Sequence, residues 1–105
     1  MEFAALNTVI LCKTEEIAQT TSFPDDFYET LEGRPGMMTK RPFRALAIQA
    51  LELSNKSVFW DVGACTASVA IESKRLFPKL DITAFEIREE CDTIIRDNLR
   101  KTATP

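Results

Sequence analysis

Apolar side chains recur at helical spacing in three segments of the C-terminal two thirds of the chain. The segments cover residues 41–53, 66–77 and 88–101. In the first segment Pro42 falls in the opening turn, and Thr39 stands where a side-chain oxygen caps a helix. The third segment begins with acidic residues and ends with Arg and Lys, as the helix dipole favours. Three helices are therefore expected.

Short runs of β-branched and aromatic residues alternate with these helices. Two of the runs, at 57–62 and 80–86, separate the helices, and a third lies at 7–12 near the N-terminus. Strands and helices that alternate with short links imply a parallel sheet with right-handed crossovers. The pattern therefore predicts an α/β fold of the Rossmann-like kind.

The segment before the first helix has weaker signals. Residues 13–22 are polar and resemble a linker, whereas residues 23–28 indicate a turn or short helix that Asp25 and Asp26 are suited to begin. Two glycines and a proline over residues 33–36 predict a loop.

The link between the strand at 57–62 and the next helix is the strongest functional signal. The strand stops at Asp61-x-Gly63, and small residues follow until the helix begins. Such a corner commonly binds a phosphate or nucleoside in an open α/β sheet, at the carboxyl ends of the strands. Glu86 ends the second strand, 19 positions after Ala67. An acid at that spacing accepts hydrogen bonds from the ribose hydroxyls of a nucleoside cofactor.

Composition excludes several classes of protein. With 105 residues, 45% hydrophobic and 28% charged, the chain suits one small globular domain. The net charge of −3 gives no general attraction to nucleic acid or anionic lipid, so neither is an expected partner. No apolar run reaches the roughly 20 residues that span a bilayer. Without a signal peptide pattern, a cytoplasmic location is expected.

The cysteine and histidine content narrows the chemistry. Cys12, Cys65 and Cys91 are odd in number and widely spaced, which favours reduced thiols over a disulfide framework. The chain contains no histidine, the commonest general base and zinc ligand. No metal site is predicted.

Several ordered motifs resemble one enzyme family over nearly the whole chain. They are FPDDF at 23–27, GMMTKR at 36–41, RAL at 44–46, WDVGA at 60–64 and SVAIE at 68–72. Together they resemble the decarboxylating precorrin methyltransferases of cobalamin biosynthesis. These enzymes methylate precorrin-6Y, or its cobalt form, and remove a carboxyl group.

The resemblance implies a fold, a cofactor and a domain division. It implies the N-terminal portion of a class I methyltransferase fold that binds S-adenosylmethionine and acts on a tetrapyrrole. Residues 1–22 resemble the tail of a preceding C5-methylating half and a linker, and residues 23–105 the beginning of the C15-methylating half. Family members continue for about as many residues again. The oligomeric state is left open.

Carried over to this sequence, the resemblance also implies a cofactor site. The residues it implies are Thr39, Gly63, Ala64, Cys65, Thr66, Ala67 and Glu86, the last on the ribose. The family has glycine where this chain has Cys65 and Ala67, so a Cβ at either position could crowd the cofactor or strain the backbone. No catalytic residue is assigned.

Each of these residues also has a simpler interpretation. Thr39 could be only a helix cap, Glu86 a surface acid and Cys65 a packing residue rather than a reactive thiol. Trp60 is expected in the core. The cluster of Lys40, Arg41 and Arg44 is equally consistent with a contact to substrate carboxylates and with a solvated helix face.

Two other functions remain open at this stage. One is a catalytically inactive remnant or interaction module, whose incomplete sheet would leave an open edge. The other is the dinucleotide-binding domain of an oxidoreductase, against which the lack of a G-x-G-x-x-G sequence argues.

Overall fold

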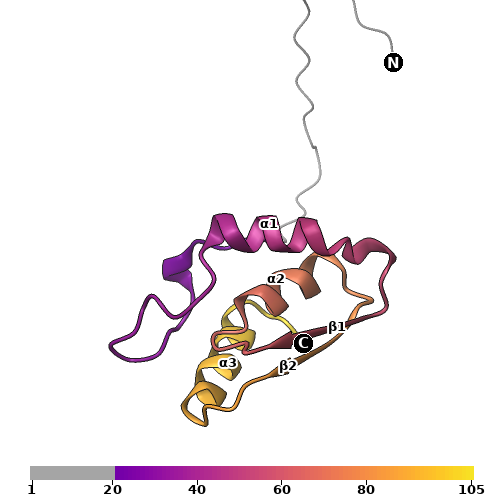
Figure 1. Ribbon diagram of the computed structural model, residues 1–105. Helices are drawn as coiled ribbons and strands as arrows, with labels where there is room; N and C mark the ends of the chain where they lie inside the picture. The colour runs from indigo at the N-terminus through magenta and orange to yellow at the C-terminus, as the bar shows by residue number, and fades with distance from the viewer. Residues whose placement is uncertain (1–20) are drawn as a thin grey trace, which may run out of the picture.

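A computed structural model describes residues 21–105 of the chain (Figure 1). The predicted strand at 7–12 lies outside the described residues, as does most of the predicted linker. The described chain has the predicted order of elements, preceded by a short 3₁₀ helix. The elements are η1 Asp25–Phe27, α1 Arg41–Leu51, η2 Leu53–Asn55, β1 Val58–Val62, α2 Ser68–Leu76, β2 Asp81–Phe85 and α3 Glu90–Lys101.

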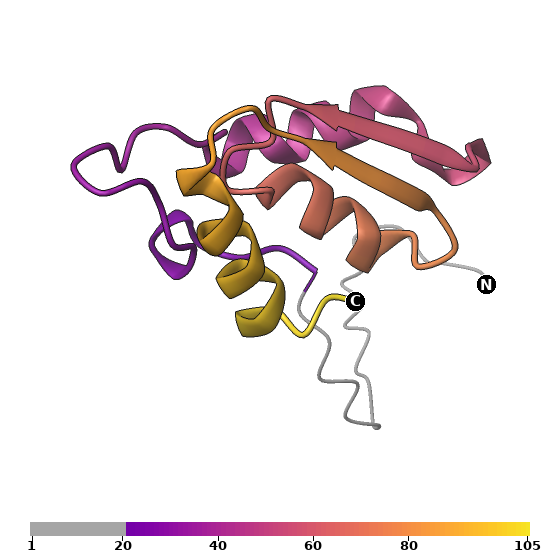
Figure 2. The ribbon, with the colours of Figure 1, turned by 90° about the horizontal axis from the view of Figure 1, so that it is seen from below.

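The two strands form a parallel sheet, as predicted. The pairing runs from Val58 opposite Asp81 to Val62 opposite Phe85, without a bulge. Because β1 and β2 point the same way, their carboxyl ends meet at one edge, where α1, α2 and α3 all begin (Figure 2). This edge is where a ligand is expected in an open α/β sheet.

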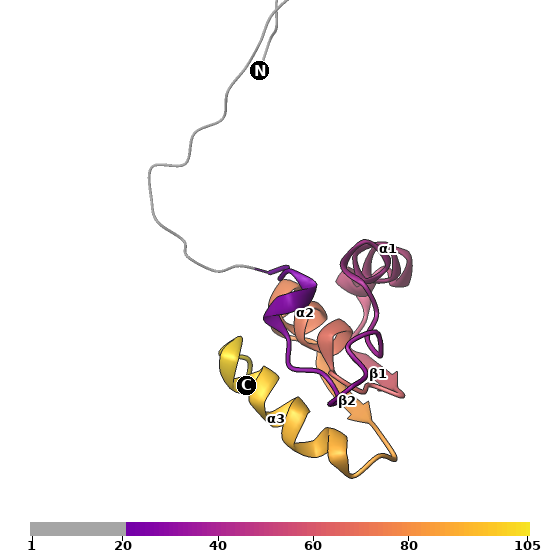
Figure 3. The same cartoon turned by 90° about the vertical axis from the view of Figure 1, so that its left-hand side faces the viewer.

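All three helices pack on one face of the sheet (Figure 3). Ile82 points toward them from β2 and contacts apolar clusters that include residues of α1, α2 and α3. The alternation of side chains along each strand sends every second residue to the opposite face. That face has no covering layer among residues 21–105, which places Val58, Trp60 and Val62 in solvent.

The expectation that Trp60 lies in the core is therefore wrong for the described chain. Its side chain is 66% exposed, and its indole contacts the ring of Phe85 edge-to-face at 5.7 Å between centroids. Trp60 belongs to the uncovered face because side chains alternate along β1, which points Trp60 away from the face that carries Phe59 and Asp61. Hydrophobicity predicted a strand correctly but could not say which faces would be covered.

Helix α1 begins at the predicted residue, Arg41, but its cap and its end differ from the prediction. Thr39 does not cap it, because the N-cap residue is Lys40, which makes no capping bond through its side chain. Instead the Asp25 carboxylate, 16 positions earlier, accepts the Arg41 N–H at 2.8 Å. The helix ends at Leu51 because Glu52 adopts a left-handed conformation with φ of 51°.

A buried ion-pair network joins η1, α1 and α2. Arg44 is fully buried, and its guanidinium donates to the Glu72 carboxylate at 2.5 Å and to the Asp25 carboxylate at 2.6 Å. It also donates to the backbone carbonyls of Phe23 and Thr39. The Tyr28 hydroxyl donates to the same Glu72 carboxylate at 2.7 Å. The predicted basic cluster is therefore split, since Arg44 is internal while Lys40 and Arg41 are exposed.

The link between β1 and α2 requires left-handed backbone at three positions. Gly63 has φ of 76°, which glycine adopts without strain. Cys65 and Ala67 have φ of 49° and 61°, conformations in which a Cβ costs roughly 1–2 kcal/mol per residue. The glycines that the resemblance implies at these two positions would relieve that strain.

No helix among residues 21–105 has the length and apolar character needed to cross a membrane.

The Arg44 network yields a stability prediction. Replacing Arg44→Met is expected to lower the free energy of unfolding by about 3–5 kcal/mol, because the buried Glu72 carboxylate loses its cationic partner. The milder Glu72→Gln change, which keeps shape and removes charge, is expected to cost about 1.5–3 kcal/mol. Urea unfolding followed by circular dichroism measures both.

The exposed pair of Arg96 and Asp92 provides the control for this prediction. The two side chains are 70% and 65% exposed, so Arg96→Met is expected to change stability by less than about 1 kcal/mol. Equal costs for Arg44→Met and Arg96→Met would contradict a dominant role for the buried network.

The strained turn leads to the prediction that replacing alanine by glycine stabilises the fold inside the turn and destabilises it inside the neighbouring helix. Ala67→Gly is expected to raise the free energy of unfolding by about 0.5–1 kcal/mol, because φ at this position is 61°. Ala70→Gly, three residues later inside α2, is expected to lower it by about 1 kcal/mol or more. Thermal unfolding compares the two variants, and a loss of stability in both would show that the turn is not strained.

Candidate functional site

The carboxyl ends of β1 and β2 bring the predicted turn and Glu86 together. The Glu86 carboxylate accepts the backbone N–H of Cys65 at 3.0 Å, and the carbonyl of Phe85 accepts the N–H groups of Gly63 and Ala64. These bonds continue the strand pairing into the turn, so the shape of the turn follows from the sheet. The prediction that Glu86 and residues 63–67 form one constellation is consistent with this arrangement.

Glu86 is held as an ionised acceptor at this edge. Its side chain is 5% exposed, and a guanidinium nitrogen of Arg88 lies 3.2 Å from its carboxylate. The Arg88 backbone N–H contributes most to lowering the pKa of Glu86, and the N–H of Cys65 adds to this effect against the opposing effect of burial. The carboxylate is therefore charged at neutral pH and cannot be described as a solvated surface acid.

Asn98 of α3 fixes the far side of the turn. Its buried side-chain amide donates to the carbonyls of Thr66 and Glu29 at 3.0 Å, and its oxygen accepts the Glu29 N–H at 2.7 Å. Thr66 is itself buried, and its hydroxyl accepts the N–H of Ser68 at the start of α2. The role of Asn98 was missed from the sequence, and its place on the apolar side of α3 near Ile95 was the available signal.

Cys65 is a buried residue, as the packing interpretation expected. It contacts Leu31 and Cys91 in a small apolar cluster, and its sulfur lies 3.8 Å from that of Cys91. Burial is the largest cause that raises the pKa of the Cys91 thiol to about 11, and the neighbouring Cys65 adds to it. Cys91 is therefore a protonated thiol at neutral pH.

Asp61 precedes the turn on the helix-covered face of β1. Burial raises the pKa of its carboxyl, and the backbone N–H of Ala70 in α2 only partly offsets this effect. The two acids therefore differ. The surroundings of Asp61 disfavour its ionised form, whereas the surroundings of Glu86 stabilise its ionised form.

Thr39 lies just before α1, whose N-terminus is at the same edge as the turn (Figure 2). The residue is exposed, and its carbonyl accepts a hydrogen bond from Arg44 at 2.8 Å. The network of Arg44 and Glu72 therefore connects Thr39 to α2. A contact between Thr39 and a cofactor stays a prediction.

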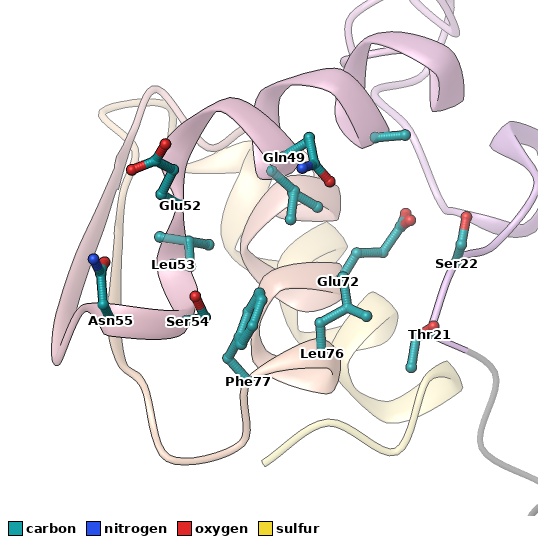
Figure 4. Close-up of a pocket in the computed structure, with 12 residues that line it drawn as sticks. Thr21, Ser22, Gln49, Glu52, Leu53, Ser54, Asn55, Glu72, Leu76 and Phe77 are labelled. Carbon is teal, nitrogen blue, oxygen red and sulfur yellow. The ribbon is translucent and has the colours of Figure 1, made fainter. Parts of the chain in front are cut away.

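A cavity among the described residues lies away from this constellation. It has a volume of about 600 Å³ and opens between α1, η2 and the end of α2. Figure 4 shows Ser22 and Glu72 toward one end of it and Ser54 and Asn55 toward the other. None of the predicted cofactor residues lines this cavity, and its position near the amino ends of the strands does not suit the ligand edge of an α/β sheet.

Comparisons with known proteins agree with the topology. The family described as "Precorrin methyltransferase domain" matches residues 31–105. The cobalt-precorrin-6B C(15)-methyltransferase (decarboxylating) of Salmonella typhimurium is 41% identical over 73 residues, which cover 70% of this chain and 38% of that protein. The probable enzyme of the same name from Thermoplasma volcanium is 35% identical over 77 residues, covering 72% and 37%.

A solved structure shares the fold. The precorrin-6y C5,15-methyltransferase of Geobacter metallireducens superposes with a TM-score of 0.73 at 35% identity, over 81% of this chain and 44% of that one. The chain thus spans less than half the length of the relatives it matches. The α/β fold is confirmed as that of a methyltransferase, and the chain belongs to the precorrin methyltransferase domain family.

Proposed function

We propose that this chain is the S-adenosylmethionine-binding part of a methyltransferase that acts on a precorrin in cobalamin biosynthesis. The observation that carries the proposal is the ionised Glu86 carboxylate, fixed against the turn after β1 at the carboxyl edge of the sheet. Family membership supports a methyl donor over a dinucleotide as the ligand of this edge.

The residues at the edge fit such a cofactor. An ionised carboxylate offers about four acceptor positions, and the N–H of Cys65 with the N–H and guanidinium of Arg88 take three of them in this structure. The guanidinium contact is partly exposed, so it can yield to a ribose hydroxyl at little cost. Glu86 would then hold the ribose, and residues 63–67 would lie along the methionine portion.

The cofactor would supply the reactive methyl group as a sulfonium. Methyl transfer to an electron-rich carbon depends on proximity and alignment more than on a strong base, which suits a chain without histidine. Lys40 and Arg41 are the exposed cations beside this edge at the start of α1, and we assign to them the attraction of tetrapyrrole carboxylates. Arg44 is excluded from that role by its burial.

A second candidate, an interaction module without catalysis, is favoured by the uncovered face of the sheet. Val58, Trp60 and Val62 are each more than half exposed, and Cys65 and Ala67 strain the proposed cofactor turn. This candidate predicts self-association or partner binding without cofactor affinity, so sedimentation velocity together with a cofactor titration separates the two functions.

Calorimetric titration of the chain with S-adenosylmethionine tests the main proposal. Glu86→Gln is expected to weaken binding by about tenfold or more, because a hydrogen bond to a charged acceptor contributes about 1.5–3 kcal/mol. Glu89→Gln is the matched control, since Glu89 is an exposed acid three residues later and is expected to leave affinity unchanged. No heat at millimolar cofactor, or equal affinities for the two variants, would overturn the proposal.

The charges of Glu86 and Asp61 lead to a pH prediction. The pKa of Glu86 is lowered on folding, so its contribution to stability is present above its unfolded pKa of about 4.3 and is lost as pH falls. The pKa of Asp61 is raised on folding, so the ionised carboxylate lowers stability at neutral pH. This loss of stability is relieved as pH falls and the carboxyl is protonated. Between pH 7 and acid, Glu86→Gln should flatten the loss of stability and Asp61→Asn should steepen it.

Chemical denaturation at a series of pH values measures these slopes. The two substitutions change one charge each without changing side-chain size, so their opposite effects on the slope isolate the protonation equilibria. Slopes that change in the same direction would contradict the assigned environments of the two acids.

A further inference from the structure

Two thiols and one carboxylate meet beneath the loop that precedes α1. Cys65 comes from the turn after β1, Glu86 from the end of β2, and Cys91 from the first turn of α3. Their sulfur and oxygen atoms all lie within 4.8 Å of one another. Both cysteines are buried, and Leu31 and Met37 pack in the same apolar cluster. No metal site was predicted from the sequence, in which the three cysteines are widely spaced.

The separation of the two sulfurs suits a shared metal ion. The Sγ atoms are 3.8 Å apart. Zinc bonds to thiolate sulfur at about 2.3 Å in tetrahedral geometry, which places two such ligands about 3.8 Å from each other. A disulfide bond is about 2.05 Å long, so the two sulfurs are not bonded to each other in this structure. The observed spacing therefore suits the coordination of one ion by both sulfurs.

The carboxylate supplies a third ligand that is already oriented. Each oxygen of Glu86 accepts a backbone N–H, one from Cys65 and the other from Arg88, and the side chain is 5% exposed. Such hydrogen bonds fix the direction of a ligating group and are common around metal sites. Two thiolates and one carboxylate leave a fourth position open, which is a donor set suited to a borderline-soft divalent cation.

We propose that Cys65, Cys91 and Glu86 form a binding site for Zn²⁺ or a similar divalent transition metal. Binding displaces the thiol protons, so protons are released and affinity rises with pH. If Glu86 also holds the cofactor ribose, as the proposed function states, metal and cofactor compete for one carboxylate.

Cobalt(II) titration of the reduced, metal-free chain tests this site. Thiolate-to-cobalt charge-transfer absorption is expected with one ion per chain, and zinc should displace the cobalt. Cys91→Ala and Cys65→Gly are each expected to weaken cobalt binding by roughly 100-fold or more, because each removes a ligand. Glu86→Gln should weaken it by about tenfold, since a neutral amide oxygen replaces an anionic ligand.

Cys12→Ser is the matched control, because Cys12 is the third thiol of the sequence and is not one of the proposed ligands. It should leave stoichiometry and affinity unchanged. Cys65→Gly restores glycine at a left-handed position, so it is expected to keep the fold, and circular dichroism verifies this. Absence of the charge-transfer band while both thiols titrate as free, or a band that survives Cys91→Ala, would overturn the proposal.

Two further results are informative whatever the activity of the protein. Formation of a Cys65–Cys91 disulfide in place of a metal complex, seen as a loss of two hydrogen masses, would overturn the metal site. Cobalt binding in a chain that shows no affinity for S-adenosylmethionine would support the metal site and overturn the proposed function separately.

Discussion

The described fold depends on the ion pairs and hydrogen bonds of the buried Arg44 guanidinium. This group joins the carboxylates of Asp25 and Glu72 and the carbonyls of Phe23 and Thr39, so one side chain connects the N-terminal segment to α1 and α2. A buried cation is tolerated only with such partners, since each unpaired charge in an interior costs several kcal/mol. The segment before α1 is thereby fixed at the ligand edge although it contains no long helix or strand.

Asn98 is a second buried polar side chain that links distant segments. It connects α3 to the segment before α1, as Arg44 connects α1 to that segment. The Asn98 amide joins Glu29 to Thr66, so hydrogen bonds connect the segment before α1, the turn after β1 and the last helix. The turn is consequently determined from three sides: by β2 through Phe85 and Glu86, by α3 through Asn98, and by α2 through its own first residues. Such over-determination explains how Cys65 and Ala67 can remain in left-handed conformations.

Periodicity predicted the order of the elements and the parallel sheet because local patterns and short links leave few topologies. It missed the interactions between residues distant in sequence. Asp25 capping α1 in place of Thr39, and Arg44 pairing inward instead of facing solvent, depend on contacts across 16 to 28 positions. Glu86 was identified correctly as a residue of the ligand edge because the strand end fixes its place, whereas its cofactor contact remains a prediction.

The uncovered face of the sheet carries an intrinsic fluorophore. Trp60 is the single tryptophan of the sequence and lies on that face beside Phe85, outside the apolar clusters beneath the helices. Its fluorescence therefore responds to whatever lies over the strands and is largely independent of helix packing. Emission at long wavelength corresponds to a wet face, and a shift to shorter wavelength would register the arrival of a covering layer, whether another segment, a second copy or a different protein.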